Sequence, residues 1–299
     1  MTRLAAKIGA LARDPMALRH TLWAHRSPTA LFARYGRLAR KAGLDRVYLI
    51  LSFDCDTNED IAAVEDVHAR VLELGIHPAY AVPGELLKRG ASVYRRLFES
   101  GAEFLNHGYR EHTYFDVERG RYRSCFFYDE LAPETVREDI RQGDACLRET
   151  LGAAPTGFRT PHFGTYQKPS QLRFLHRVLR ELGYRFSTST VPLYGFRYGP
   201  LFERFGLTEI PVCGRSSAPL AIFDSWSHFA QPERTVGPAD FIEEGRTLGA
   251  RLAEQRAGVI NFYADPSHIR DSVAFFETLA HWREVAEPAT YPDLVGRFS

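Results

Sequence analysis

Short apolar segments alternate with longer amphipathic segments after residue 46, and this alternation constrains the fold most strongly. Seven segments have the composition of buried strands, at residues 46–53, 77–83, 102–106, 156–163, 184–190, 207–212 and 259–264. Segments with helical periodicity occur at 56–75, 94–101, 132–152, 170–183, 238–258 and 272–287, the last of which we expect to end the fold. Repeated strand-then-helix units favour parallel strands with helices packed outside. The sequence therefore predicts an α/β fold, and long loops after the strands are typical of a barrel.

Side chains that can perform chemistry accompany the ends of five predicted strands. They are Asp54 and Asp56 with the first strand, His107 and His112 with the third, Arg159 with the fourth, Asp224 and Trp226 with the sixth, and Asp265 and His268 with the seventh. Each has an ordinary explanation alone, since an aspartate beyond a strand is often a helix cap. In a barrel, however, the carboxyl ends of the strands share one face. We therefore expect carboxylates, imidazoles and one guanidinium to meet on that face.

The spacing of two histidines raises the question of a metal site. His107 and His112 are five positions apart, so neither a helix nor a strand would point both side chains in one direction. Both reach one ion only if the chain leaves regular structure at Gly108, which tolerates unusual backbone angles. The spacing by itself leaves two interpretations open, namely metal ligands or ordinary polar loop residues.

The amino-terminal segment differs in charge from the rest of the chain. Residues 1–44 contain nine lysine or arginine residues and one acidic residue, Asp14, which leaves residues 45–299 with a net charge of −7. Leu4, Ile8 and Leu11 share one helical face, as do Leu31, Tyr35 and Leu38. We predict one or two basic amphipathic helices as an extension of the barrel. This extension either packs on the body of the protein or contacts an anionic membrane surface or an acidic partner. The acidic remainder argues against nucleic-acid binding.

The cysteines bear on the cellular compartment. Cys55, Cys125, Cys146 and Cys213 contain no C-x-x-C pair, so neither a disulfide framework nor a cysteine zinc site is expected. No apolar segment has the length of a membrane span, and charged residues interrupt the amino-terminal segment where a secretion signal would be apolar. We therefore expect a cytoplasmic protein, with peripheral membrane contact through residues 1–44 as an open alternative.

Five motifs in chain order carry a resemblance to a known family. They are "SFDCDT", "NHGYREH", "FRTPHFG", "FDSW" and "DPSH". From about Val47 to the carboxyl terminus the chain resembles the polysaccharide deacetylases, also called the NodB-homology or carbohydrate esterase family 4 group. "FDCD" is similar to the F-D-x-D variant of the first motif of that family. The resemblance implies a distorted (β/α)7 barrel, similar to a TIM barrel, over residues 45–299.

The resemblance also implies roles for individual residues. Asp56, His107 and His112 would be the metal ligands, and a carboxylate with two imidazoles suits a divalent ion, for which Zn²⁺ is the expected metal. Asp54 would be the general base, and Arg159 would orient it. The substrate would lie against five further residues, namely Tyr109, Pro161, Phe163, Asp224 and Trp226.

Two departures from the family pattern concern the second histidine and the proton donor. His107 and His112 are separated by one residue more than in the family. Asp265, followed by Pro266, stands where the family has a histidine, and His268 comes three positions later. We expect His268 to be the general acid because an imidazole titrates near neutrality, and we leave Asp265 as the alternative donor or as the residue that orients the imidazole.

These motifs together predict a metal-dependent N-deacetylase that acts on an acetamido sugar during cell-surface glycan biosynthesis. Residues 113–133 form a long loop with Arg119, Arg121 and Arg123, which would meet the phosphate of a nucleotide- or lipid-linked sugar unless the loop is simply solvated. Two other functions remain open. One is hydrolysis of a non-sugar amide or cyclic ureide on the same fold, and the other is a catalytically inactive barrel that binds a glycan or a partner.

Overall fold

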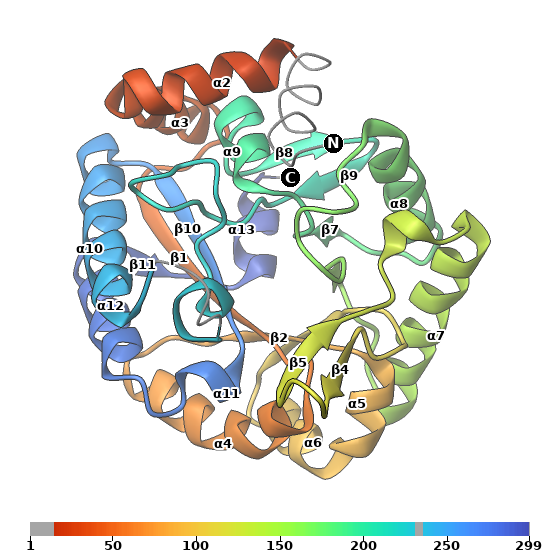
Figure 1. Cartoon of the computed structure of the whole chain (residues 1–299). Coiled ribbons are helices and arrows are strands. Elements are labelled where there is room, and N and C mark those ends of the chain that lie inside the picture. Colours follow the sequence, from red (N-terminus) through yellow and green to blue (C-terminus); the bar gives the residue numbers. More distant parts are fainter. Residues whose placement is uncertain (1–14, 231–235, 299) are drawn as a thin grey trace.

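A curled, mostly parallel sheet surrounded by helices forms the body of the protein (Figure 1). The computed structural model describes residues 15–230 and 236–298. All seven predicted strands are present, as β1 (Val47–Asp54), β2 (Ala79–Val82), β3 (Glu103–Asn106), β6 (Gly157–Phe158), β7 (Phe186–Ser187), β9 (Leu207–Glu209) and β10 (Gly258–Ala264). Their order is β10-β1-β2-β3-β6-β7-β9, and every neighbouring pair is parallel. The predicted fold class, a distorted (β/α) barrel with amino-terminal helices, is confirmed.

The distortion of the barrel lies between β9 and β10. No ladder joins these two strands within the described part of the chain. Instead, residues 210–213 bridge the opening, because the amide of Cys213 donates to the carbonyl of Asn261 at 2.8 Å. The side-chain amide of Asn261 donates in turn to the carbonyls of Ile210 and Pro211, at 2.9 and 3.0 Å. Two further strands join this sheet, namely β8 (Phe202–Arg204), antiparallel beside β9, and short β11 (Glu287–Pro288), parallel beside β1.

The two longest strands explain the centre of the fold. Every residue of β1 and β10 is buried, as expected when helices cover the outer face and side chains fill the barrel. The outer layer contains α4 (Asn58–Glu73), α5 (Gly84–Arg89), α6 (Ala91–Glu99), α7 (Pro133–Leu151), α8 (Pro169–Glu181), α9 (Pro192–Tyr198), α10 (Pro238–Gln255), α11 (Pro266–Ile269) and α12 (Val273–Val285). The expectation that residues 272–287 form the last helix is wrong, because α13 (Tyr291–Phe298) follows them.

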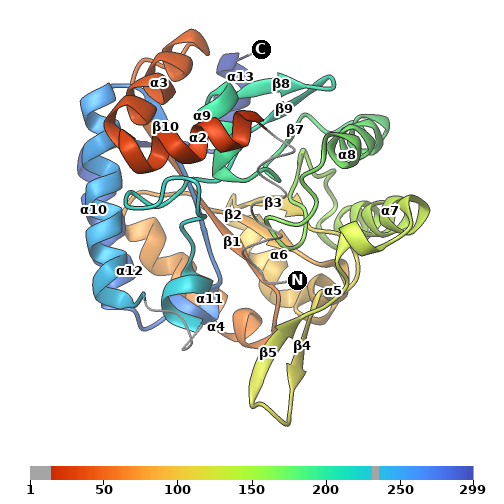
Figure 2. The same cartoon turned by 45° about the horizontal axis from the view of Figure 1, so that its top comes forward.

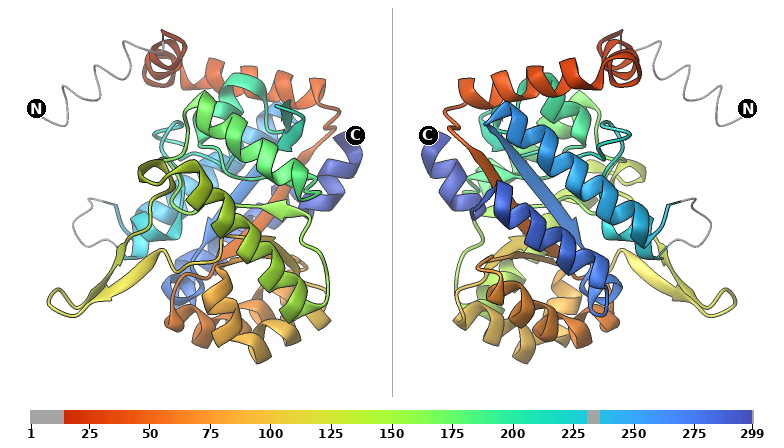
Figure 3. Two further views of the ribbon diagram at one scale, coloured as in Figure 1. Left: turned by 90° about the vertical axis from the view of Figure 1, so that its right-hand side faces the viewer. Right: turned by 90° about the vertical axis from the view of Figure 1, so that its left-hand side faces the viewer.

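The predicted loop 113–133 contains secondary structure of its own. β4 (Thr113–Asp116) and β5 (Arg121–Ser124) form an antiparallel hairpin that projects from the body (Figure 3). A short helical turn, η1 (Tyr128–Glu130), then leads to α7. The buried side chain of Tyr128 fixes the base of this segment by donating to Asp139 Oδ2 at 2.6 Å.

In the described part of the chain, two helices precede the barrel and lie along one side of it (Figures 1 and 2). They are α2 (Pro15–Arg26) and α3 (Pro28–Lys41), and the predicted face Leu31–Tyr35–Leu38 lies on α3. Tyr35 is buried and donates to the carbonyl of Val259 at 2.9 Å, so α3 is tied to β10. The predicted face of Leu4, Ile8 and Leu11 lies outside the described residues, and the boundary at residue 44 stays a prediction. Within the described residues, the helices fall short of the length and apolarity that crossing a bilayer requires.

Candidate metal centre and catalytic pocket

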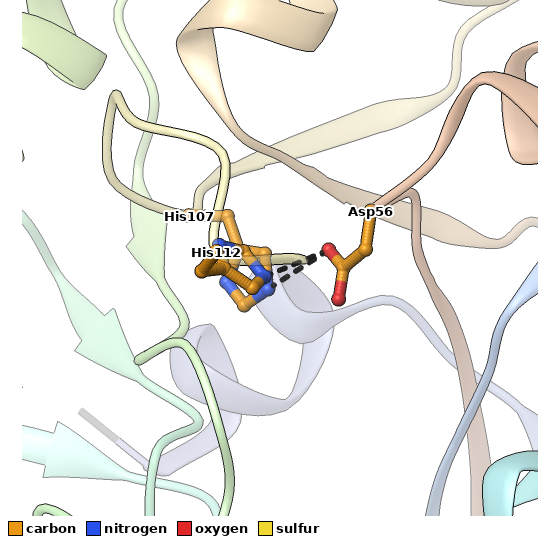
Figure 4. A group of neighbouring side chains, drawn as sticks. All are labelled: Asp56, His107 and His112. Atoms are coloured by element: carbon orange, nitrogen blue, oxygen red, sulfur yellow. Dashed lines mark ion pairs between the residues drawn. The ribbon is translucent and has the colours of Figure 1, made fainter. Parts of the chain in front are cut away.

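Asp56, His107 and His112 meet at the carboxyl ends of β1 and β3 (Figure 4). Oδ1 of Asp56 lies 3.6 Å from Nε2 of His107 and 3.0 Å from Nε2 of His112. The extra residue between the histidines is accommodated by a turn at Gly108, whose φ is +79°. A Cβ atom on Gly108 would lie 2.3 Å from Oδ2 of Asp139, so this close turn requires glycine. The two imidazoles therefore converge despite a spacing that no regular element would allow.

The hydrogen bonds around this group leave its inner atoms free to bind a cation. Nδ1 of His107 lies 2.8 Å from the carbonyl oxygen of Arg159, which only accepts, so Nδ1 carries the proton and Nε2 keeps its lone pair. Apart from their mutual contact at 3.0 Å, Oδ1 of Asp56 and Nε2 of His112 are buried without a hydrogen-bond partner among the described residues, as is Nδ1 of His112. Buried polar atoms in that state are costly unless a further group satisfies them. A carboxylate oxygen with two imidazole nitrogens is a donor set that fits a divalent ion.

The protonation states also suit ligation. Burial lowers the pKa of His107 to about 3, so its imidazole is neutral at neutral pH. Burial opposes ionisation of Asp56, but the adjacent His112 outweighs it and holds the pKa of the carboxyl below its usual range. The same pairing overcomes the effect of burial on His112 and raises the pKa of that imidazole. A metal ion would replace the proton that these two residues share in its absence.

Asp54 lies beside this centre and is held by a buried arginine. Nη1 of Arg159 donates to Oδ1 of Asp54 at 2.5 Å, and Nη2 donates to the hydroxyls of Ser52 and Tyr291, each at 2.7 Å. Burial raises the pKa of Asp54 to about 6, even though the Arg159 charge opposes the shift. Arg159 therefore fixes the orientation of a carboxylate that is more basic than usual.

A second aspartate, Asp60, joins two loops of the site. Its Oδ2 accepts from the amides of Asp56 and Thr57, both at 3.0 Å, while Oδ1 accepts from the amide of Ser267 at 2.9 Å. Asp60 is fully buried. The pattern Thr57-x-x-Asp60 is a capping box that starts α4 and is the sequence signal of this residue. The carboxylate thus connects the loop of the predicted metal ligand to the loop of the predicted proton donor.

A cavity of about 370 Å³ opens onto these residues. Asp54, Asp56 and His107 line it, together with the predicted Phe163, Asp224, Trp226 and Asp265. Tyr109 and Pro161 are outside the lining that the described residues form. Pro161 is buried. The ring of Tyr109 packs against Gly84 of α5, and the ammonium of Lys88 lies 5.4 Å from the ring centroid.

The two candidates for the proton donor occupy different positions. Asp265 lines the cavity, whereas His268 is outside the described lining and contacts Asp265, with Nδ1 at 3.0 Å from Oδ2. The ring of His268 also lies beside Trp226, with a centroid separation of 5.5 Å. Burial lowers the pKa of His268 to about 4, and burial together with neighbouring carboxylates raises the pKa of Asp265 well above its usual range.

Three pocket residues have no place in the sequence-based prediction. His162 donates from Nε2 to the carbonyl of Cys125 at 2.7 Å, and its ring lies 5.0 Å from that of His112. It stands inside the motif "FRTPHFG", which could have drawn attention to it. Tyr263 is on β10, where the strand alternation gives its direction, and its ring lies 4.8 Å from Phe163. Arg215 lines the cavity from an irregular loop, for which the sequence gives no signal.

The hairpin arginines do not reach the cavity. Arg119 and Arg123 pair with Asp116, at 2.8 and 3.4 Å. The described lining of the cavity includes Thr113 and Ser124 from the hairpin base, but not Arg119, Arg121 or Arg123. The expectation that these arginines meet a substrate phosphate is therefore not supported by their positions.

Comparison with known proteins identifies the family that the site resembles. Residues 42–187 match the model of the polysaccharide deacetylase family, which confirms the predicted resemblance, while the F-D-x-D branch stays a prediction. A Mycobacterium smegmatis protein described as a polysaccharide deacetylase is 18% identical, with a TM-score of 0.64 over 84% of this chain and 90% of that one. PuuE allantoinase is 14% identical, with a TM-score of 0.60 over 85% and 90%.

A third similar structure is a carbohydrate esterase family 4 pseudoenzyme from Bacillus anthracis. It is 10% identical, with a TM-score of 0.51 over 83% of this chain and 65% of that one. At these identities the three structural likenesses show the fold alone. A search of curated proteins gave no match.

Proposed function

We propose that this chain, whose residues 42–187 match the polysaccharide deacetylases, hydrolyses an N-acetyl group from an amino sugar with the help of a divalent metal ion. The family match supports a deacetylase. The observation that carries the metal-dependent form is the convergence of Asp56, His107 and His112 with buried ligand atoms that have no other partner in the described residues. Zn²⁺ is the ion that this donor set suits best.

The proposed chemistry begins with water attack on the acetyl carbonyl. A bound divalent ion lowers the pKa of water and polarises an acyl oxygen. Asp54 lines the pocket and accepts the proton of the attacking water, and Arg159 keeps its carboxylate aimed. A carboxylate whose pKa is raised to about 6 is a stronger base than an exposed aspartate and is still ionised at neutral pH.

The departing amine then needs a proton, and the pocket supports Asp265 rather than His268 as the donor. Asp265 lines the cavity, and the upward shift of its pKa favours the protonated carboxyl, whereas His268 is outside the described lining and its imidazole is neutral at neutral pH. In this proposal His268 holds Asp265 in place through Nδ1 at 3.0 Å. The role first expected for His268 thus passes to Asp265, which was the alternative.

The shape and charge of the cavity suggest the rest of the substrate. Trp226 is half-buried and lines the cavity, so it can contact a sugar face, as can the adjacent rings of Phe163 and Tyr263. Arg215 lines the same cavity, and its Nε is buried without a hydrogen-bond partner in residues 15–230 and 236–298. A phosphate would satisfy it, which supports a nucleotide- or lipid-linked acetamido sugar in glycan assembly. A cytoplasmic location remains a prediction.

The direct test is acetate release from defined acetamido sugars by the metal-loaded full chain. We expect acetate from N-acetylglucosamine oligomers or from UDP-N-acetylglucosamine, and loss of release in Asp56→Ala. Ammonia or a ring-opened product from allantoin, without acetate from any sugar, would favour the cyclic ureide alternative. A protein that binds glycans but fails to bind metal would favour the inactive barrel.

A further inference from the structure

The exposed face of α2 combines positive charge with apolar side chains. Residues 15–44 contain six arginine or lysine residues and no aspartate or glutamate. On α2 the exposed positions are Leu18, Arg19, Leu22, His25 and Arg26. Their spacing of one, four, seven and eight residues from Leu18 places all five on a single helical face.

The leucines of this face are unusually exposed for a folded protein. Leu18 and Leu22, one turn apart, are 39% and 46% exposed as whole residues. The opposite side of α2 is occupied, because Trp23 and Ala24 pack against the main core. Arg19 lies over the ring of Trp23 at 5.4 Å, so its charge stands at the border between the exposed face and the packed side of α2. A face of leucines flanked by arginines is the pattern of a helix that lies in a lipid interface.

The position of α2 relates this face to the catalytic pocket. A small cavity of about 130 Å³ separates α2 from the loop 217–221, with Thr21, Ala24 and His25 on one side. The end of the same loop, Ala221 with Ile222, lines the catalytic cavity. Figure 2 shows α2 crossing the molecule above this loop. The loop 217–222 thus connects the inner side of α2 with the lining of the catalytic cavity.

We propose that the exposed face of α2 binds the surface of an anionic lipid bilayer. The arginines attract anionic headgroups, and Leu18 and Leu22 enter the boundary between headgroups and acyl chains. An acidic protein would match the charges, but it would leave the paired leucines without a function. As a consequence, which rests on the proposed function, substrates anchored to that bilayer would be presented at the pocket.

The test is cosedimentation of the full chain with vesicles, which requires neither metal nor activity. We expect binding to mixed phosphatidylcholine–phosphatidylglycerol vesicles and little binding to phosphatidylcholine alone, with the difference reduced at high salt. Arg19→Gln with Arg26→Gln should weaken binding at least about tenfold. Leu18→Gln with Leu22→Gln should weaken it by a similar factor while leaving the Tm unchanged, because both leucines are exposed.

A matched control removes two charges elsewhere. Arg141→Gln with Arg185→Gln changes exposed residues of α7 and of the segment before β7, and we expect it to bind vesicles nearly as the natural chain does. Equal weakening by the control, or no binding of the natural chain to anionic vesicles, would overturn the proposal. A vesicle-free dimer that the leucine variant dissociates would overturn it in favour of a contact between copies. Loss of deacetylation with intact vesicle binding would instead count against the proposed function alone.

Discussion

Oδ2 of Asp265 lies 3.0 Å from Nδ1 of His268, and of the two residues Asp265 is the one that lines the cavity. This relationship assigns the two candidates different tasks, because a proton donor must contact the leaving group. His268, which contacts that donor, would control the orientation and the proton affinity of Asp265. The pair therefore gives a test that distinguishes proton donation from positioning.

Asp265→Asn should lower kcat for an acetamido sugar by about 10²-fold or more, since the amine leaves poorly without a proton. The same variant should lose much less activity on an activated ester such as p-nitrophenyl acetate, whose leaving group needs no proton. His268→Asn should reduce both activities only modestly. Steady-state kinetics on the two substrates provides the measurement, and a larger selective loss in His268→Asn would make His268 the donor.

Asp54→Asn should abolish the base while retaining the ion. We expect kcat to fall by roughly 10²–10⁴-fold, with metal content unchanged by elemental analysis. The matched variant Asp224→Asn alters another carboxylate of the same cavity and should leave a larger share of kcat. Loss of metal from Asp54→Asn would show that Asp54 is a ligand rather than a base.

Arg159→Met should destabilise the fold because it leaves the buried Asp54 carboxylate without its partner. Removing one member of a buried ion pair typically costs about 3–5 kcal/mol. Adding Asp54→Asn to Arg159→Met should recover part of that loss, since the uncompensated charge disappears. Urea unfolding of the two single variants and the double variant gives the coupling free energy. Strictly additive effects would contradict the ion pair.

Asp60→Asn should weaken metal binding without touching a ligand. Both oxygens of its carboxylate accept hydrogen bonds, one from the amides of Asp56 and Thr57 and the other from the amide of Ser267. Asparagine has only one side-chain oxygen, so it cannot accept on both sides. Partners that orient ligands typically contribute about 10–100-fold to metal affinity. Competition with a zinc-sensitive dye would measure the change, and an unchanged affinity would reduce Asp60 to a helix cap.

Glu103 at the start of β3 should make the stability of the protein depend on pH. Burial raises its pKa to about 8, so the folded state keeps a proton that the unfolded state releases above its own lower pKa. The free energy of unfolding therefore falls as pH rises from about 5 to about 8, by at most about 1.4 kcal/mol per pH unit from this group. Glu103→Gln should remove that slope. The free energy of unfolding of the variant should therefore exceed that of the natural chain most clearly near pH 8. Urea unfolding at several pH values tests this. The same dependence of the free energy of unfolding on pH in the variant and the natural chain would contradict it.

The sequence predicted those features that repeat or that lie in compact motifs. The long buried strands β1 and β10 were visible because both faces are apolar, and "SFDCDT" and "NHGYREH" each contain their ligands within a few residues. The seven-strand count was correct even for β6 and β7, which have only two residues each in the sheet. Their flanking helices, with strong amphipathic periodicity, made these strands recognisable.

Features that depend on distant contacts could not be predicted. Tyr291 reaches Arg159 from α13, a helix too short to show a clear period, and Asn261 closes the barrel through carbonyls of residues 210–211. Arg215 lines the cavity only because an irregular loop turns there. The choice between Asp265 and His268 depends on which side chain lines the cavity, and α11, which begins after Asp265 and contains His268, has only four residues and is too short to show a period.

The central claim is that Asp56, His107 and His112 bind one divalent ion. The most direct measurement is an anomalous-scattering crystal structure of the zinc-loaded full chain. The account predicts one ion bonded to Asp56 and to Nε2 of both histidines at roughly 2.0–2.2 Å. An ion bound elsewhere, or no ion in crystals grown with excess zinc, would contradict it.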